Sequence, residues 1–292
     1  MHLGVLGNPG SWYFADIERA ARERGHRSTR LDFDRLVATI GPGGVRGFAA
    51  NADVEFDDID VVIVRTMPPG SLEQVVFRMD ALAQLEAAGK TVLNPPQAIE
   101  CAVDKYLTTA KLAAAGLDVP QTVVCENAES AIEAFQRLGS DVVVKPLFGA
   151  EGRGILRVSD ADLALRTFRT LERIDAVLYL QRYVDHEGYD IRGVVLDGEL
   201  LGGIKRRAEG DFRTNVSRNG RAESYTLSDS EHNVAIRAAQ AIGTRFAGVD
   251  LLYDKSGQLY VLEVNAVPGW RAFGRATGID VASELVTKLE RD

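Results

Sequence analysis

The sequence has few cysteines and no long apolar run, and each shortage excludes a class of protein. Only two of its 292 residues are cysteines, Cys101 and Cys125, which is too few for a disulfide framework and lacks the paired spacing of a zinc or redox site. No stretch reaches the roughly 18 apolar residues that a membrane span requires. We therefore expect two small buried cysteine side chains and no membrane partner.

Basic residues are also in short supply. Lysine and arginine total 34 against 42 aspartates and glutamates, a formal net charge of −8. Nucleic-acid binding by the whole protein is thereby disfavoured, because phosphates must be neutralised by a basic face. Residues 1–12 carry no basic flank before an apolar run, so no signal peptide is expected and we predict a cytoplasmic protein. With 46% hydrophobic and 26% charged residues, the composition is that of a soluble globular protein of two or three domains.

Apolar runs alternate with helical spacing in the first third of the chain. They predict strands at 3–7, 61–64 and 91–93 and helices at 12–24 and 71–88. Such alternation is typical of a parallel α/β unit. We interpret the glycine-rich segment 41–47 as a mobile loop.

After Pro95 and Pro96 the pattern becomes α+β. Helices are predicted at 104–115, 129–138, 160–171, 229–246 and 279–291. Strands are predicted at 119–125, 141–145, 155–158, 176–184, 190–195, 200–206, 248–253 and 258–265. The fold class is thus α/β followed by α+β, and not one doubly wound sheet.

Two acids and an amide share one predicted hairpin near the end of the chain. If its turn is centred on Ser256 and Gly257, Asp250 lies opposite Glu263, and Asn265 shares their face. Opposed carboxylates raise each other's pKa, so a cation should lie between them, and these oxygen ligands suit Mg²⁺. The alternative is an exposed face with solvated acids, and a turn longer by one residue would shift the pairing.

A lysine precedes a glycine-rich loop in the middle of the chain. Pro146 favours an extended Lys145, and the glycines of the loop 149–154 allow backbone amides to approach an anion. The loop leads into a strand and matches neither a Walker A motif nor a dinucleotide fingerprint. A lid over nucleotide phosphates fits, whereas the simpler alternative is an ordinary turn. Lys105 could likewise be a solvated helix lysine.

The segment 205–221 is basic within an acidic protein. It contains six basic residues and two acidic ones, which gives a local charge of +4. Guanidinium groups bind phosphates and carboxylates bidentately, so this segment suggests anionic ligands. A solvated surface charge run is the alternative.

Together these residues resemble the RimK-type glutamate ligases of the ATP-grasp superfamily over essentially the whole chain. The matching stretches are residues 94–122, 142–155, 179–184 with 190–195, 205–221, and AGVDLL (247–252) with LEVNAVPGW (262–270). The resemblance implies an ATP-grasp fold of three domains, at 1–96, 97–185 and 186–292. ATP would lie between the second and third domains, with Mg²⁺ or Mn²⁺ as the metal.

The resemblance also implies a role for each matching residue. Lys105 and Lys145 would contact the phosphates, and the loop with Gly149, Gly152 and Gly154 would close over them. The remaining roles fall to Gln181, Arg182, Tyr183 and Val184 beside adenine, Asp190 at the ribose, Arg213, Thr214 and Asn215 near the triphosphate and the acceptor, and Asp250, Glu263 and Asn265 at the metal. Arg182 stands where many relatives carry glutamate. Our candidates for stabilising the reaction intermediate are Arg192, Arg206 and Arg213.

The activity that this resemblance implies is ATP-dependent addition of L-glutamate to a carboxylate acceptor through an acyl phosphate. The motifs look closest to the tetrahydromethanopterin:α-L-glutamate ligases, so we expect a pterin cofactor as the acceptor. Two alternatives are a ligase for a ribosomal or other protein tail and a nucleotide-binding regulator without ligase activity. Whether copies of the chain form a homo-oligomer is left open.

Overall fold

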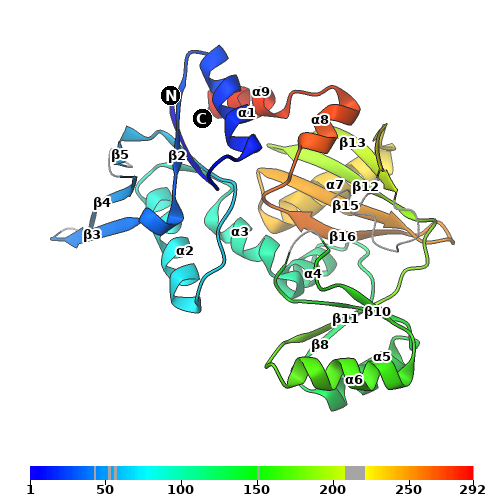
Figure 1. Ribbon diagram of the computed structural model, residues 1–292. Coiled ribbons are helices and arrows are strands. Elements are labelled where there is room, and N and C mark those ends of the chain that lie inside the picture. The colour runs from blue at the N-terminus through cyan, green and yellow to red at the C-terminus, as the bar shows by residue number, and fades with distance from the viewer. Residues whose placement is uncertain (43, 52–53, 56–57, 150–151, 208–220, 292) are drawn as a thin grey trace.

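The computed structural model describes residues 1–42, 44–51, 54–55, 58–149, 152–207 and 221–291. Its strands form four sheets in this part of the chain. Figure 1 shows the N-terminal sheet, the C-terminal sheet and the smaller central sheet in three separate regions, with helix α4 between the last two.

The first sheet is parallel, as the sequence predicts. Its strands are β1 (His2–Leu6), β2 (Arg27–Leu31), β6 (Val61–Val64) and β7 (Thr91–Leu93), in the order β2-β1-β6-β7. Helix α1 (Trp12–Glu23) joins β1 to β2, and helix α2 (Leu72–Ala87) joins β6 to β7. Strand β2 and the short 3₁₀ helix η1 (Phe33–Arg35) were not predicted, because the polar sequence of β2 has little apolar periodicity.

The predicted loop at 41–47 is wrong. Strands β3 (Val37–Gly41) and β4 (Gly44–Asn51) form an antiparallel hairpin there, and β5 (Val54–Glu55) extends it. Gly41 pairs with Gly44, so these two glycines belong to the strands of the hairpin. The glycines that indicated a loop lie mostly within strands.

The central sheet is antiparallel in the order β10-β9-β11-β8. The elements of this region are α3 (Pro96–Val103), α4 (Lys105–Ala114), β8 (Thr122–Cys125), α5 (Ala128–Arg137), β9 (Val142–Lys145), β10 (Leu156–Val158), α6 (Ala161–Glu172) and β11 (Leu178–Arg182). Helices α5 and α6 pack on the sheet through Phe135 and Phe168. Helix α3 was not predicted; Pro96 occupies its first turn, where a missing amide is tolerated.

The C-terminal sheet is antiparallel in the order β14-β13-β12-β15-β16. The elements of this region are β12 (Tyr189–Leu196), β13 (Glu199–Arg207), β14 (Arg221–Tyr225), α7 (Asp229–Ile242), β15 (Phe246–Tyr253), β16 (Leu259–Asn265), α8 (Arg271–Thr277) and α9 (Val281–Leu289). Helix α7 ends before the predicted residue 246, because Gly243 adopts a left-handed conformation with φ of 80°. Strand β14 and helix α8 were not predicted.

The first and last regions of the chain share one hydrophobic core. Leu3 and Ile17 from the N-terminal sheet and α1 pack with Trp270, Phe273 and Leu285 from the C-terminal region. Figure 1 shows α9 beside α1, with the two chain ends close together. The three-domain division at 96 and 185 stays a prediction, and this shared core holds its outer two parts against each other.

The structure shows where the two cysteines lie and how long and apolar the helices are. Cys101 is 1% exposed in the core, and Cys125 is half-buried beside another core cluster. Across the described residues, no helix has both the length and the apolarity needed to cross a lipid bilayer.

Asn94 connects the parallel sheet to the C-terminal sheet. It follows β7, is 1% exposed, and accepts hydrogen bonds from the amides of Arg245 and Phe246, both 2.8 Å away. Its own amide group donates to the carbonyls of Phe246 and Ala266. One buried side chain therefore satisfies backbone groups at the start of β15 and just after β16.

We expect Asn94→Ala to lower the free energy of unfolding by more than about 3 kcal/mol, because it leaves several buried backbone groups without partners. Urea denaturation of the purified protein would measure the change. The matched control is Asn233→Ala on the exposed face of α7, where alanine should be neutral or slightly stabilising. Equal stability of the two variants would contradict this role for Asn94.

Candidate functional site

The predicted pairing of Asp250 with Glu263 is confirmed. The two residues are direct partners on β15 and β16, and Asn265 lies opposite Gly248 two pairs further on, on the same face. The predicted turn is wrong by one residue, since Tyr253 pairs with Leu259. A β-bulge after Asp250 shifts the register and restores the predicted partners at the site.

Asp250 is almost completely buried, at 4% exposed. Arg192 donates to both of its carboxylate oxygens, from Nε at 2.7 Å and from Nη2 at 2.8 Å. Arg206 approaches it at 2.9 Å. Burial alone would raise the pKa of Asp250, but the two guanidinium groups outweigh burial and lower it to about 2. Asp250 is therefore ionised across the neutral range, and the cations that the sequence required beside it include two arginines.

The same face of the sheet carries a second buried ion pair. Arg206 is a cross-strand partner of Asp190 and donates to both of its oxygens, from Nε at 2.6 Å. Both side chains are 3% exposed. The residues on this face, read from β13 across to β16, are Arg206, Asp190, Arg192, Asp250 and Glu263. From β13 to β15 the opposite charges pair across neighbouring strands, which favours this register of the sheet, whereas Asp250 and Glu263 place two acids opposite each other.

Lys145 ends β9, as its position before Pro146 predicts, and it faces this charged row from the central sheet. Its ammonium donates to the side-chain oxygen of Gln181 at 2.7 Å. Burial lowers the pKa of Lys145 to about 8, Glu263 and Asp250 act to raise it, and Lys105 lowers it further. The two lysines and the two acids are thus close enough to influence one another.

Lys105 begins helix α4 and is not a solvated helix lysine. The cap Asp104 accepts a hydrogen bond from the amide of Leu107 at 3.0 Å, and the ammonium of Lys105 donates to the carbonyl of Gly149 at 2.9 Å. Burial lowers the pKa of Lys105, and the charge of Glu263 opposes that effect. Lys105 therefore contacts the beginning of the glycine-rich loop.

Three glycines of this loop have positive φ, namely Gly149 at 153°, Gly152 at 70° and Gly154 at 74°. Side chains at such angles are strained, so the loop depends on glycine. A Cβ at Gly149 would also lie 3.3 Å from the ring of Pro146. Ala150 and Glu151 are outside the described residues.

The segment from Gln181 to Val184 leaves the central sheet beside Lys145. Gln181 is 3% exposed, and its amide group donates to the hydroxyls of Thr122 and Tyr179 at 3.1 and 3.2 Å. Arg182 is exposed, and Arg157 lies over the ring of Tyr183 at 3.5 Å. Among the described residues, none hydrogen-bonds to the backbone of Val184. Its amide and carbonyl can therefore bind the edge of a planar base.

Before β14, the basic segment has three described positions, 205–207, and thirteen that lie outside the described residues, 208–220. Arg206 is buried in the ion pairs, and Lys205 and Arg207 lie 4.4 and 4.8 Å from the ring of Tyr189. A purely solvated charge run is therefore wrong for this part. Arg213, Thr214 and Asn215 lie outside the described residues, so their roles stay predictions.

Tyr179 is a site residue that the sequence analysis missed. Its hydroxyl bonds to that of Thr109 at 2.8 Å and accepts from Gln181, so it orients the partner of Lys145. Tyr179 and Gln181 are two residues apart on one strand and share a face. This two-residue spacing from Gln181 is the sequence signal that could have identified Tyr179.

The assembled groups suit an anion carried with a divalent cation. In the described part of the chain, no three or more His, Cys, Asp and Glu side chains cluster as a metal site. Asp250, Glu263 and Asn265 offer hard oxygen atoms only, a set that fits Mg²⁺ when phosphate oxygens and water complete the shell. Lys105, Lys145 and Arg192 supply the positive charge that such phosphates require.

Comparisons with known proteins agree with this geometry. Residues 102–289 match the model of the RimK-like ATP-grasp domain. The chain is 33% identical to a tetrahydromethanopterin:α-L-glutamate ligase of Methanosarcina acetivorans, covering 99% of this chain and 98% of the relative. It is 31% identical to a ribosomal protein bS6–L-glutamate ligase of Escherichia coli, covering 100% and 96%.

Solved structures show the same fold. The ATP-grasp ligase PsnB superposes with a TM-score of 0.77 at 23% identity, covering 99% of this chain and 98% of that one. A RimK domain ATP-grasp protein from Sphaerobacter thermophilus gives a TM-score of 0.73 at 21% identity, covering 98% of each chain. PsnB was also solved with Mg and ADP.

The two opposed acids should differ in what they do for stability. Asp250→Asn leaves Arg192 and Arg206 without their shared buried counter-charge, so we expect a loss of about 3 to 5 kcal/mol in the free energy of unfolding. Glu263 is only half-buried, and Glu263→Gln should change it by less than about 1 kcal/mol. Urea denaturation measures both. A stable D250N protein would mean that the arginines do not depend on Asp250.

Proposed function

The chain belongs to the RimK-like ATP-grasp family and is an ATP-dependent ligase, and from this premise we propose that it joins L-glutamate to a carboxylate of a tetrahydromethanopterin-type cofactor. The observation that carries the chemistry is the arrangement of Asp250 and Glu263 as direct cross-strand partners facing two partly buried lysines, Lys105 and Lys145. The choice of acceptor is supported by the similarity to the Methanosarcina relative over nearly the whole of both chains.

The reaction needs two bond exchanges. A carboxylate oxygen of the acceptor attacks the γ-phosphorus of ATP, the bond to the β-phosphate oxygen breaks, and ADP leaves. The product is an acyl phosphate on the acceptor. The amine of glutamate then attacks the acyl carbon, loses a proton, and inorganic phosphate leaves as the amide forms. Neither step requires a covalent enzyme nucleophile, so catalysis rests on positioning and on charge neutralisation.

The described residues divide this work between the two sheets. Lys145 and Lys105 neutralise the phosphates from the central sheet and α4, and the loop from Gly149 to Gly154 covers them. The backbone of Val184 binds the adenine edge. Arg192 contacts the acyl phosphate, and its fork is oriented by the bidentate pair with Asp250. Arg206 forms ion pairs with Asp190 and Asp250, and it therefore positions those acids.

Asp250, Glu263 and Asn265 would hold Mg²⁺. When bound, the metal neutralises phosphate charge. Because two arginines already balance Asp250, Glu263 supplies most of the negative charge that the protein offers to a cation. The set is complete in this chain, which argues against a regulator that has lost the reaction.

The test is phosphate release from ATP with L-glutamate and either tetrahydromethanopterin or a synthetic peptide copying the tail of ribosomal protein bS6. We expect release only with the pterin, together with a product heavier by one or more glutamate residues in mass spectrometry. L-Aspartate replaces glutamate as the substrate control, and E263Q is the folded variant that should not turn over. Turnover of the peptide and not of the pterin would overturn the acceptor assignment.

Lys145 should impose an alkaline limit on the use of ATP. With a pKa near 8, its ammonium loses its proton as the pH rises through that value, and with it the attraction for phosphate. We expect kcat/KM for ATP to fall above about pH 8, since this parameter reports groups of the free enzyme. In Lys145→Arg the charge persists, so the fall near pH 8 should vanish even if the rate is lower. The same fall in both proteins would contradict the prediction.

A further inference from the structure

Arg65 occupies the point of the parallel sheet at which ligands commonly bind. It directly follows β6, whose neighbour in the sheet is β1. From β1 the chain proceeds to β2 on one side, and from β6 it proceeds to β7 on the other. The direction of the connections therefore reverses between β1 and β6. Open parallel sheets bind ligands outside the carboxyl ends of their strands at such a reversal.

The guanidinium of Arg65 is buried, and no carboxylate among the described residues forms an ion pair with it. Arg65 is 7% exposed, and its guanidinium lies against two aromatic rings, 4.9 Å from the centroid of Tyr13 and 4.4 Å from that of Trp270. Its Nη2 donates to the carbonyl of Pro268 at 2.8 Å. Its Nε is buried and has no hydrogen-bond partner within the described part of the chain.

Burial lowers the pKa of Arg65 to about 10, and the neighbouring phenol of Tyr13 opposes this effect. The side chain remains protonated at neutral pH. A buried charge without a counter-ion is unfavourable, and two aromatic faces compensate for it only in part. Arg65 is therefore suited to an anion.

Arg65 lies beside the charged row of the C-terminal sheet. A Cβ at Gly248 would be 3.2 Å from Cβ of Pro268, the residue whose carbonyl Arg65 binds, and 3.5 Å from Cδ of Arg192. On its other side, Tyr13 belongs to the first turn of α1, where Ser11 already caps the amide of Phe14. The amides of Trp12 and Tyr13 at the start of this twelve-residue helix have no preceding turn to bond to.

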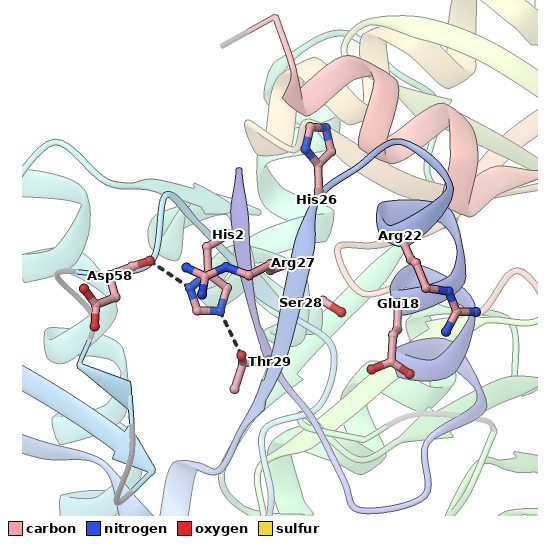
Figure 2. Close-up of a pocket in the computed structure, with 8 residues that line it drawn as sticks. All are labelled: His2, Glu18, Arg22, His26, Arg27, Ser28, Thr29 and Asp58. Atoms are coloured by element: carbon pink, nitrogen blue, oxygen red, sulfur yellow. Dashed lines mark hydrogen bonds between the residues drawn. The ribbon is translucent and has the colours of Figure 1, made fainter.

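The opposite end of the same sheet has a pocket of about 420 Å³ (Figure 2). Its central side chain, His2, is already engaged on both ring nitrogens, with the carbonyl of Asp58 and the hydroxyl of Thr29, each at 2.8 Å. That pocket lies at the amino ends of β1 and β2. The unsatisfied donor is at the carboxyl end, with Arg65.

We propose that Arg65 and the first turn of α1 bind a substrate carboxylate that takes no part in bond formation. This inference rests on the proposed function, in which both glutamate and the acceptor carry carboxylates. Nε of Arg65 has no partner among the described residues, and Nη2 has a second N–H besides the one that binds Pro268, so the two nitrogens can together bind a carboxylate. The first-turn amides and the helix dipole add to this attraction. Arg65 is thus a specificity-determining residue for one of the two substrates.

The test is binding without turnover, in the presence of Mg²⁺ and a non-hydrolysable ATP analogue. Calorimetry gives the affinities of L-glutamate, of 4-aminobutyrate, which lacks the α-carboxylate, and of tetrahydromethanopterin, for wild type and Arg65→Met. The chain has two tryptophans, Trp12 and Trp270, with rings 5.3 and 4.8 Å from that of Tyr13. Intrinsic fluorescence therefore reports glutamate binding at this cluster directly.

We expect R65M to bind one ligand about 10- to 100-fold more weakly, as the loss of a charged hydrogen bond predicts, with no loss of thermal stability. Weaker glutamate binding, with discrimination against 4-aminobutyrate lost, assigns the carboxylate to glutamate. Weaker tetrahydromethanopterin binding assigns it to the acceptor. Failure of the pterin to bind wild type would overturn the acceptor assignment alone, because the glutamate titration still tests Arg65.

The matched control is Arg166→Met, which removes an exposed arginine paired with Asp162 on α6 and should change nothing. Unchanged affinities in R65M for every ligand that wild type binds would overturn the inference. Arg65 would then only pack against the rings of Tyr13 and Trp270. If R65M does not fold, Arg65→Lys replaces it. Lysine keeps the charge and loses the two-pronged guanidinium, so unchanged affinity in R65K would also overturn the inference.

Discussion

The ion pairs around Asp250 are the interaction on which the rest of the site depends. A carboxylate 4% exposed is held ionised by Arg192 and Arg206, and Asp190 holds Arg206 in turn. Removing any one member leaves the buried charges unbalanced, so the four side chains act as a unit. Their positions are fixed by the pairing of three strands. Glu263, directly opposite Asp250, then faces Lys145 of the central sheet and Lys105 of α4 from a rigid base.

The two regions that we propose to contact the nucleotide complement each other in charge. The C-terminal sheet contributes the acids, and the central sheet with α4 contributes Lys105 and Lys145, whose pKa values are lowered by burial. A protein of net charge −8 thereby has a local cluster of cations of the kind that a triphosphate requires. Burial also strengthens each interaction, because the low local dielectric leaves charges poorly screened.

The parallel sheet at the N-terminus is attached firmly to the C-terminal region. Asn94 satisfies backbone groups at the start of β15 and after β16, and Trp270 packs in a core shared by α1 and α9. This attachment brings Arg65 into contact with the loop that follows β16, where Arg65 donates to the carbonyl of Pro268. The acceptor or glutamate can therefore be bound by one region and activated by another.

The sequence by itself determined what local spacing controls. It determined the parallel α/β beginning, the strand that ends at Lys145, and the Asp250–Glu263 pair, because a hairpin and a two-residue period place near neighbours. Local patterns predicted a loop at 41–47 and no helix at α3, and both predictions were wrong. In these two places glycine and proline lie inside strands and a helix and not in the loops between them. Only the tertiary structure decided that Arg192 and Arg206 converge on Asp250, and that Arg65 lies against the rings of Tyr13 and Trp270 with no acid partner among the described residues. Those partners are separated by long stretches of chain, and their contacts follow from sheet order and core packing, which no local pattern encodes.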